Sequence, residues 1–475
     1  MLRRTKIVAT LGPASENLET LKKMIGAGLN IVRNNFSHGT ARDHKKRIDT
    51  VRQAAKEMNV IVGILADLQG PKIRVSKFKA GKVFLADGAE FVLDAALDVD
   101  AGDETTVGVD YKELPGDVKP DDTLLLDDGR LVFTVKRVDG TKIVCDVIVG
   151  GELSNNKGIN RKGGGLSAPA LTDKDKADLK TAVSLGVDYI AISFPRSAQD
   201  MIEAKTLIQK AGGSAGVIAK IERLEAVEPE TLDAIIKASD GIMVARGDLA
   251  VEIGEAQVPA AQKRMIQRAR ILDKPVITAT QMMESMIHSP VPTRAEVSDV
   301  ANAVLDNTDA VMLSAESATG DHPPLVVETM ARVCFAAEQD QMTQVSGHRV
   351  ECFFERVDET ISMAAMYAAN HMNATAIICL TESGSTPLWM SRIRSGIPIF
   401  ALSRHQTTLG KMALFRDVHP IYFDVTKHDE GDIEKAAIVE IQKHKLINAG
   451  DFVVITRGPQ QGIHGGTNTM KILAV

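Results

Sequence analysis

Along the first two thirds of the chain, short apolar runs recur, each followed by a polar, glycine-bearing turn and a stretch with helical periodicity. The stretches include residues 17–27 and 172–184, whose apolar positions recur at the spacing of an amphipathic helix. Strands that alternate with helices form parallel βα units, and eight such units predict an α/β fold, a closed (β/α)8 TIM barrel. The eight predicted strands, KIVAT, NIVRNN, VIVGILAD, VDYIAISF, GVIAK, GIMVA, KPVITAT and DAVMLS, end at Thr10, Asn35, Asp67, Phe194, Lys220, Ala245, Thr280 and Ser314.

The alternation is interrupted between the third and fourth predicted strands. Residues 71–169 are rich in Val, Leu, Asp and Gly, and DDG and VDG turns separate short alternating runs such as RLVFTVKRV. This pattern predicts an inserted all-β domain. Because loops after barrel strands lie on the face where barrel enzymes carry their sites, we expect the insertion to be a lid. The alternative is a domain with no role in the chemistry.

A third unit follows the barrel pattern. The helix-like stretch DETISMAAMYAANHM precedes four strand-like runs, ATAIICL, IPIFALS, FVVITRG and TMKILAV. They predict an open C-terminal α/β domain with a mostly parallel sheet. The expected division is therefore a barrel of residues 1–70 and 170–345, a lid of residues 71–169 and a C-terminal domain of residues 346–475.

Composition narrows the class of protein. The formal net charge of −6 argues against a nucleic acid or an anionic membrane as a partner held by bulk charge. The four cysteines are far apart and form no CxxC pair, which is typical of a reduced, intracellular protein without a disulfide framework. The sequence contains no apolar run long enough for a membrane span. We expect a cytoplasmic protein.

Polar residues gather where the predicted strands end, which is where barrel enzymes place their catalytic groups. Neighbouring strand ends meet in space, so these residues should form one site. The candidates are Arg33, Asn35, Ser37, His38, Asp67, Lys72, Arg74, Lys220, Glu222, Arg246, Gly247, Asp248, Thr278, Thr280, Gln281, Ser314 and Glu316.

Two carboxylates among these residues favour a divalent metal. Lys220 and Glu222 are two positions apart on a strand, so their side chains point the same way, and Asp248 follows the next strand. Two carboxylates with open positions for water and phosphate suit Mg²⁺, or Mn²⁺ in its place. Lys220 beside that metal suits the charge that develops on a transferring phosphoryl group. A lysine and a glutamate at this spacing would otherwise indicate a surface ion pair.

The strand-six and strand-seven ends indicate a site for a small carboxylic acid. Gly247 allows backbone amides to approach an anion, and Thr280 adds a hydroxyl. Arg33, with Lys220 and the metal, would hold the phosphate of such a substrate. Arg74 and Lys157 are candidates for a nucleotide's phosphates, although a solvated lysine would explain Lys157 equally well.

Six segments together resemble the pyruvate kinase family, and the resemblance extends over essentially the whole chain. They are RNNFSHGT, DLQGPKIR, AKIE, MVARGDLAVEIG, ITATQMMESM and PTRAEVSDVANAVLDNTDAVMLSAESATG. The resemblance implies barrel, lid and C-terminal domains in this order, a homotetramer and allosteric control through the C-terminal domain. It also implies the last step of glycolysis, in which the phosphoryl group of phosphoenolpyruvate passes to ADP to give pyruvate and ATP.

The resemblance also implies residue roles. Arg33 corresponds to the arginine on the substrate phosphate, Lys220 to the group that stabilises the transition state, and Glu222 and Asp248 to the metal ligands. We expect a water near Thr280 and Ser314 to protonate the enolate. The implied substrate contacts are Gly247, Asp248 and Thr280, and the implied ATP/ADP contacts are Asn35, Ser37, His38, Arg74 and Lys157.

Two positions depart from the family pattern. Asn34 stands where members usually carry an apolar residue, which we expect to affect packing rather than chemistry. At the monovalent-cation pocket, Lys72 stands where K⁺-dependent members carry a glutamate. Its ammonium could supply the charge that K⁺ otherwise brings. We therefore expect activity without K⁺, whereas a Lys72 directed to solvent would leave the pocket to fill as usual. The other positions of this pocket are Asn35, Ser37, Asp67 and Leu68.

The C-terminal domain carries a candidate effector site. Hydroxyl residues follow a predicted strand where a helix should begin, and hydroxyls with helix-N-terminal amides can bind phosphate. This loop resembles the effector loop of allosteric pyruvate kinases, and the Gly-rich stretch from Arg457 to Asn468 could close over it. A sugar phosphate or a nucleotide would bind there, whereas an N-capped helix without a ligand would show the same residues. They are Thr381, Ser383, Gly384, Ser385 and Thr386.

Two other functions stay open on the residues. A metal-dependent barrel lyase or aldolase acting on pyruvate-type enolates would share the two carboxylates, but it would need neither the long insertion nor a nucleotide-phosphate set. A catalytically silent metabolite sensor would not need Arg33, Lys220, Glu222 and Asp248 together. Nucleotide dependence and turnover distinguish these alternatives.

Overall fold

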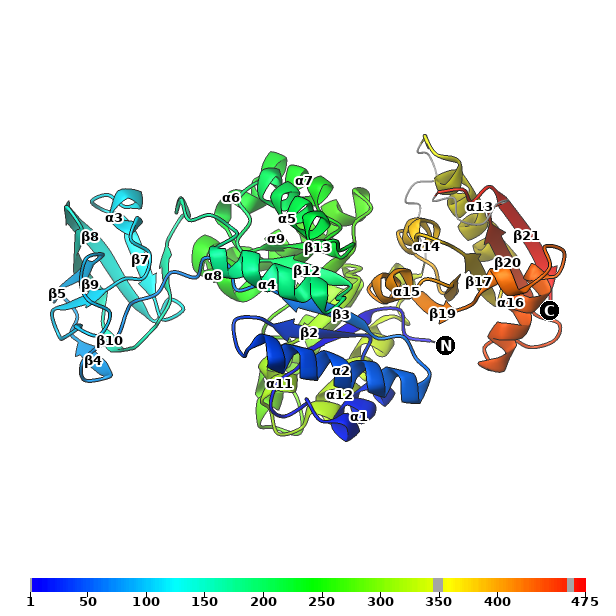
Figure 1. Cartoon of the computed structure of the whole chain (residues 1–475), viewed down its shortest axis with the longest axis horizontal. Coiled ribbons are helices and arrows are strands. Elements are labelled where there is room, and N and C mark those ends of the chain that lie inside the picture. The colour runs from blue at the N-terminus through cyan, green and yellow to red at the C-terminus, as the bar shows by residue number, and fades with distance from the viewer. Residues whose placement is uncertain (1, 345–352, 459–464) are drawn as a thin grey trace.

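The computed structural model describes residues 2–344, 353–458 and 465–475. Figure 1 shows three bodies in a row, with the β-rich lid at one end, the barrel in the middle and the C-terminal domain at the other end. The fold class predicted from the sequence is confirmed. The residue limits of the three domains stay a prediction.

Eight parallel strands close into a barrel in the order β1, β16, β15, β14, β13, β12, β3, β2. Each predicted run forms one strand, but three strands end earlier than predicted, so that Phe194, Thr280 and Ser314 lie in the following loops. Phe194 and Thr280 have φ angles of 54° and 68°, and this left-handed backbone cannot continue a strand. The strands are β1 (Lys6–Thr10), β2 (Ile31–Asn35), β3 (Gly63–Asp67), β12 (Tyr189–Ile192), β13 (Gly216–Ile221), β14 (Gly241–Ala245), β15 (Val276–Ala279) and β16 (Ala310–Leu313).

Helices surround the barrel, and several begin where the sequence supplies a cap. Thr40, Thr172 and Thr293 each accept a hydrogen bond from the backbone amide three positions on, and the acidic side chain at that position accepts one from the amide of the threonine. The helices are α1 (Leu18–Gly26), α2 (Ala41–Met58), α4 (Asp173–Ser184), α5 (Ala198–Lys210), α6 (Leu224–Val227), α7 (Pro229–Ala238), α8 (Arg246–Ile253), α9 (Val258–Ile271), α10 (Arg294–Leu305), α11 (Ala315–Ala318) and α12 (Pro323–Ala337).

Alternate residues of the barrel strands join different apolar clusters. On β1, Ile7 packs with residues of the surrounding helices, whereas Val8 belongs to a cluster that continues into the C-terminal domain at Met412. Tyr189, at the start of β12, donates a hydrogen bond from its hydroxyl to Lys411 O at 2.9 Å. The C-terminal domain therefore covers the end of the barrel where its strands begin, and the carboxyl ends of the strands are left for the site.

The insertion has its own apolar core, in which Phe91, Phe133 and Cys145 are fully buried. Its strands form a six-stranded sheet in the order β11-β7-β8-β9-β5-β6 and a two-stranded sheet β10-β4. The insertion also contains one helical turn that the all-β prediction did not include, α3 (Leu114–Asp117). The strands are β4 (Lys82–Leu85), β5 (Glu90–Asp94), β6 (Thr106–Gly108), β7 (Thr123–Leu126), β8 (Leu131–Asp139), β9 (Lys142–Val149), β10 (Gly151–Ser154) and β11 (Ile159–Arg161).

The C-terminal domain has a five-stranded sheet in the order β19-β18-β17-β20-β21, with only β21 antiparallel to its neighbour. The prediction missed β19 (Val418–Tyr422), in which Val418 alone is buried and Pro420 interrupts the apolar pattern. The other α-helices and strands of this domain are α13 (Val357–Met372), β17 (Ala376–Leu380), α14 (Ser385–Ser391), β18 (Ile399–Ser403), α15 (Gln406–Met412), α16 (Ile433–Lys443), β20 (Phe452–Arg457) and β21 (Thr469–Ala474).

Candidate active site

The carboxyl ends of β2, β3 and β13 bring Arg33, Asp67 and Lys220 together. Arg33 donates from Nε to Asp67 Oδ2 at 2.6 Å, and Lys220 Nζ lies 3.3 Å from Asp67 Oδ1. Burial alone would raise the pKa of Asp67, but the charges of Lys220 and Arg33 outweigh burial and lower it. Asp67 therefore stays ionised and holds two cations at the strand ends, an arrangement that suits a phosphorylated anion.

The ammonium of Lys220 is held from several sides. Nζ donates to Ser193 Oγ at 2.7 Å and lies 2.9 Å from Glu222 Oε1. Burial alone would lower the pKa of Lys220, but the carboxylates of Asp67 and Glu222 raise it above its usual value. The group is thus a fixed positive charge, which suits the negative charge that develops on a transferring phosphoryl group.

Glu222 lies just after β13, and its surroundings fit a cation. The side chain is 1% exposed, and Oε2 accepts a hydrogen bond from Phe194 N at 2.8 Å. Oε1 is buried and accepts no hydrogen bond from the described residues, although Lys220 Nζ lies near it. Burial raises the pKa of Glu222 to about 7, and the charge of Asp248 adds to this rise. A divalent cation would relieve the repulsion between these two carboxylates.

Glu222 and Asp248 would not enclose a metal alone. Within residues 2–344, 353–458 and 465–475, no group of three or more His, Cys, Asp or Glu side chains could hold a metal ion. An open site with two protein carboxylates is nevertheless usual for Mg²⁺, which keeps several waters and takes substrate oxygens as further ligands. The residues present therefore fit Mg²⁺.

The ends of β14 and β15 are joined through Thr280. Helix α8 begins at Arg246, so the amides of Gly247 and Asp248 lie in its first turn, where the helix supplies no acceptor for them. Gly247 N donates to Thr280 Oγ1 at 3.0 Å, and the Thr280 hydroxyl donates to Ala279 O at 2.6 Å. A left-handed threonine is strained, and such strain concentrates at functional sites. This arrangement can receive a small carboxylate.

Ser314 lies in the loop after β16, which pairs with β15. Its amide donates to Glu316 Oε2 at 2.6 Å, and Met283 N donates to Glu316 Oε1 at 3.3 Å. The buried Glu316 thus connects the loops that follow β15 and β16. The structure brings the loops of Thr280 and Ser314 side by side on neighbouring strands.

The loop after β2 holds Asn35, Ser37 and His38 in one turn. Asn35 Oδ1 accepts from Ser37 N at 3.1 Å, and His38 N donates to Asn35 O at 3.3 Å. His38 is exposed. The neighbouring Asn34 is fully buried, and neither Oδ1 nor Nδ2 has a hydrogen-bond partner among the described residues. Burial of this amide without a hydrogen-bond partner costs stability.

Three predicted cations lie nearer to the lid. Lys72 Nζ is 3.8 Å from Asp248 Oδ1, with the side chain 31% exposed, so Lys72 extends into the site. Arg74 donates from Nη1 to Asn156 O at 2.9 Å. Lys157 Nζ contacts Asp127 Oδ1 at 2.7 Å within the lid. Arg74 and Lys157 therefore lie close together at the base of the lid, where Val75 N donates to Lys157 O at 2.9 Å.

Sequence reasoning missed two residues of the site, Thr10 and Ser193. Thr10 Oγ1 accepts from Arg33 Nη1 at 2.9 Å, and Ser193 Oγ connects Lys220 Nζ to Leu68 O, to which it donates at 2.7 Å. Both residues stand at or just after the end of a barrel strand. The rule that selected the other candidates would have found them, had it been applied to the first and fourth strands.

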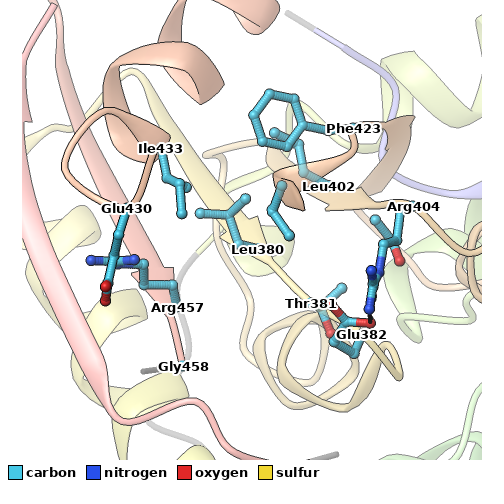
Figure 2. A pocket seen from close by; sticks show the side chains of 12 residues that line it. Leu380, Thr381, Glu382, Leu402, Arg404, Phe423, Glu430, Ile433, Arg457 and Gly458 are labelled. Atoms are coloured by element: carbon cyan, nitrogen blue, oxygen red, sulfur yellow. Dashed lines mark hydrogen bonds and ion pairs between the residues drawn. The ribbon is translucent and has the colours of Figure 1, made fainter. Parts of the chain in front are cut away.

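A second candidate site lies in the C-terminal domain. A cavity of about 310 Å³ lies beside the loop after β17, and Figure 2 shows side chains that line it. Thr381 lines it and accepts from Gly384 N at 2.9 Å, whereas Thr386 is buried with its hydroxyl 2.8 Å from that of Thr467. The other labelled residues that line the cavity are Leu380, Glu382, Leu402, Arg404, Phe423, Glu430, Ile433, Arg457 and Gly458.

The predicted effector loop makes its own contacts beside this cavity. Ser383 and Ser385 join through their hydroxyls at 3.1 Å, and Gly384 has a φ angle of 83°. Part of the Gly-rich stretch from Arg457 to Asn468, residues 459–464, lies outside the described residues.

None of the helices in the described part of the chain is both long and apolar enough to cross a membrane.

A TIM barrel that gathers an arginine, a buried lysine and two carboxylates at its strand ends, beneath an inserted lid, is suited to metal-assisted phosphoryl transfer. The comparisons with known proteins agree. The chain matches the model of the pyruvate kinase barrel domain over residues 2–327 and that of the pyruvate kinase alpha/beta domain over residues 359–473.

Curated relatives match along the whole chain. The sequence is 56% identical to pyruvate kinase II of Salmonella typhimurium and 55% identical to the pyruvate kinase of Haemophilus influenzae, in each case over 100% of this chain and 99% of the relative. It is 44% identical to pyruvate kinase 2 of Synechocystis, over 100% of this chain and 79% of the relative.

The chain belongs to the pyruvate kinase family. It is a phosphotransferase that moves the phosphoryl group of phosphoenolpyruvate to ADP, giving pyruvate and ATP in the last step of glycolysis. This assignment sets aside the lyase and sensor alternatives. Members of the family generally use Mg²⁺ and K⁺.

Proposed function

We propose that Arg33, Lys220, Glu222 and Asp248 form the phosphoryl-transfer centre of this enzyme. The observation that carries the proposal is the buried Lys220 ammonium, which lies 3.3 Å from Asp67 Oδ1 and 2.9 Å from Glu222 Oε1. A charge fixed in this way needs no reorganisation when negative charge develops on a transferring phosphoryl group.

In this proposal Arg33 and Lys220 bind the phosphate of phosphoenolpyruvate, and Asp67 orients both of them. The first turn of α8 and the Thr280 hydroxyl hold the substrate carboxylate. Mg²⁺, or Mn²⁺, supplies charge stabilisation to the phosphoryl oxygens and to the enolate. Lys220 stays charged and stabilises the same enolate until a water near Thr280 and Ser314 gives it a proton.

The nucleotide would be held between the barrel and the lid. Asn35, Ser37 and His38 lie in the loop at the barrel end, and Arg74 and Lys157 lie at the base of the lid. Lys157 would exchange Asp127 for a phosphate when the lid closes, because a charge-assisted contact with a dianionic phosphate is stronger than one with a single carboxylate.

The test is pyruvate formation from phosphoenolpyruvate and ADP with Mg²⁺, in wild type and Lys220→Met. We expect the variant to lose at least about 10³-fold in kcat, because a fully charged group is removed from the reacting phosphoryl. The matched control is Lys205→Met, which removes a lysine paired with Asp240 at 2.9 Å near the start of β14. Equal turnover in Lys220→Met and wild type would refute the assignment.

We also propose that the enzyme works without K⁺. The support is the position of Lys72, whose ammonium reaches into the site 3.8 Å from Asp248 Oδ1. The same assay with Na⁺ as the only monovalent cation should give turnover in wild type, and Lys72→Glu should become K⁺-dependent. Strong K⁺ activation of the wild type that is unchanged in Lys72→Glu would discard this proposal and leave the phosphoryl-transfer centre untouched.

A phosphorylated effector, either a sugar phosphate or a nucleotide, is proposed for the loop of Thr381, Ser383, Gly384, Ser385 and Thr386. The support is the adjoining cavity, which has an apolar wall and the basic groups Arg404 and Arg457. Titration of the wild type with sugar phosphates and nucleoside monophosphates should lower the KM for phosphoenolpyruvate, and Ser383→Asp should remove the response by repulsion. A response that survives in Ser383→Asp would place the effector elsewhere.

A homotetramer and a cytoplasmic location complete the proposal. The homotetramer rests on the family, which the full-length match to the relatives supports, and the cytoplasmic location rests on the cysteine usage and on the lack of a long apolar run. Light scattering of the purified protein should give four times the chain mass of 51.1 kDa. Fractionation of the source cells should recover the protein in the soluble fraction.

A further inference from the structure

The segment that returns from the lid to the barrel, residues 164–168, is gripped by side chains that directly follow Glu222. We call this segment the return strap. Arg223 donates from Nη1 to Leu166 O at 2.9 Å and from Nη2 to Ala168 O at 3.5 Å. Glu225 accepts a hydrogen bond from Gly165 N. A cation thus holds the carbonyls of the strap, and an anion holds its amide.

Arg223 is connected to the proposed metal site as well as to the strap. Its side chain is buried, and its guanidinium carbon lies 5.8 Å from the centre of the Phe194 ring. Phe194, in turn, donates from its amide to Glu222 Oε2 at 2.8 Å. Arg223 therefore lies against the residue whose amide holds Glu222, and it connects the strap to the loop of Glu222.

The strap is also fixed to the lid, so that the two move together. Ser167 donates from its amide to Asp117 Oδ2 at 2.8 Å, and Tyr111 donates from its hydroxyl to the same atom at 2.8 Å. Immediately before and within the strap, Gly163, Gly164 and Gly165 have φ angles of 86°, 71° and 84°. These glycines allow the backbone to turn, and Arg223 holds the chain just after them.

We propose that Arg223 is a positioning residue for phosphoryl transfer. It clamps the return strap against the loop of Glu222 and so sets where the lid rests when the nucleoside diphosphate binds. This inference rests on the proposed roles of Glu222 in metal binding and of the lid in nucleotide binding. Its predicted defect therefore concerns the nucleotide and not phosphoenolpyruvate, which the barrel holds by itself.

The kinetic test compares Arg223→Met and Arg223→Lys with the wild type. We expect Arg223→Met to raise the KM for ADP about tenfold, as for the loss of a charge-assisted hydrogen bond, while the KM for phosphoenolpyruvate changes less than about twofold. The KM for ADP of Arg223→Lys should lie between the values of the wild type and Arg223→Met. The matched control is Arg264→Met, because Arg264 donates from Nη2 to Val227 O at 3.2 Å, at the end of α6 and away from the strap.

A second readout is independent of activity. Trypsin can cut after Arg161 or Lys162, just before the strap, and with Mg²⁺ and ADP present this cleavage should be several times faster in Arg223→Met than in wild type or Arg264→Met. Mass spectrometry identifies the cut. If Arg223→Met does not fold, the cleavage rate and KM values of Arg223→Lys decide.

The inference is overturned if both KM values and the cleavage rate stay at their wild-type levels, or if Arg223→Met lowers only the melting temperature. It is also overturned if the two KM values rise equally. A failure of the metal assignment is seen separately, because the Mg²⁺ concentration for half-maximal activity would then not respond to Glu222→Gln.

Discussion

Asp309, just before β16, is one of the barrel side chains that hold the C-terminal domain. Its Oδ2 accepts from Val276 N at 3.0 Å and from Arg392 Nη1 at 3.1 Å, and its Oδ1 accepts from Arg416 N at 3.0 Å. Arg392 Nη2 also donates to Oδ1. Asp309 and Arg392 are each 1% exposed. The substitution Asp309→Asn would therefore leave a buried guanidinium without its counter-charge.

Removal of one partner of a buried ion pair costs about 3–5 kcal/mol, because the other charge stays out of water without compensation. The chain has 475 residues. At roughly 2.1 cal/mol/K per residue, its entropy of unfolding is about 1 kcal/mol/K, so the melting temperature should fall by about 3–5 °C if the chain unfolds as one unit. Arg392→Met should cost less, because the Asp309 carboxylate keeps two amide donors. The double variant Asp309→Asn/Arg392→Met should be less destabilised than the sum, by about 2 kcal/mol.

The assay is urea unfolding followed by tryptophan emission. Trp389 is the one tryptophan of the sequence, and it lies in α14 shortly before Arg392, so its emission reports on this joint. Asp49→Asn is the control, because Asp49 pairs with Lys45 at 2.5 Å on an exposed face and should contribute less than about 1 kcal/mol. A loss below about 1 kcal/mol in Asp309→Asn, or strict additivity in the double variant, would refute the reasoning.

Three further substitutions test other parts of the structure. Glu222→Gln should raise the Mg²⁺ concentration for half-maximal turnover at least tenfold, and an unchanged Mg²⁺ titration would contradict the ligand assignment. Burial raises the pKa of Asp188 from 3.8 to about 7, so this carboxyl stabilises the fold below about pH 4 and loses that contribution as pH rises through 7. Relative to wild type, the free energy of unfolding of Asp188→Asn should therefore rise by about 1–2 kcal/mol from pH 5 to pH 8, as measured by urea unfolding at both pH values. An equal change with pH in the two proteins would contradict this prediction. Asn34→Leu should stabilise the fold by about 1 kcal/mol, because it removes a buried amide without partners, and a lower melting temperature would show that the site is too tight for leucine.

The barrel strands were predictable because their signals are local. A run such as KIVAT is buried throughout, since helices cover one side of the barrel wall and side chains fill the other. The spacing of Lys220 and Glu222 predicted that the two side chains point the same way, and Lys220 Nζ lies 2.9 Å from Glu222 Oε1. β19 was not predictable in this way, because its burial comes from pairing with β18 and not from an apolar run of its own.

The partners of the site residues were beyond the reach of the sequence. Ser193 and Lys220 stand on different strands, and their contact depends on the order of strands in the closed barrel. The direction of Lys72 depends on where the chain leaves the barrel for the lid, and the structure places it next to Asp248. Arg223 gave no chemical signal in the sequence, because its hydrogen bonds go to two carbonyl groups of the return strap, which lies far from it along the chain.

By itself, the sequence determined the (β/α)8 order, the inserted lid and the set of charged groups at the strand ends, because periodicity and turn chemistry act between neighbours along the chain. Only the tertiary structure decided how those charges compensate one another. Asp67 lies between Arg33 and Lys220, and Asp309 joins the barrel to Arg392 of the C-terminal domain. The physical reason is that the energy of a buried charge depends on what surrounds it in space, and residues far apart in sequence supply that surrounding.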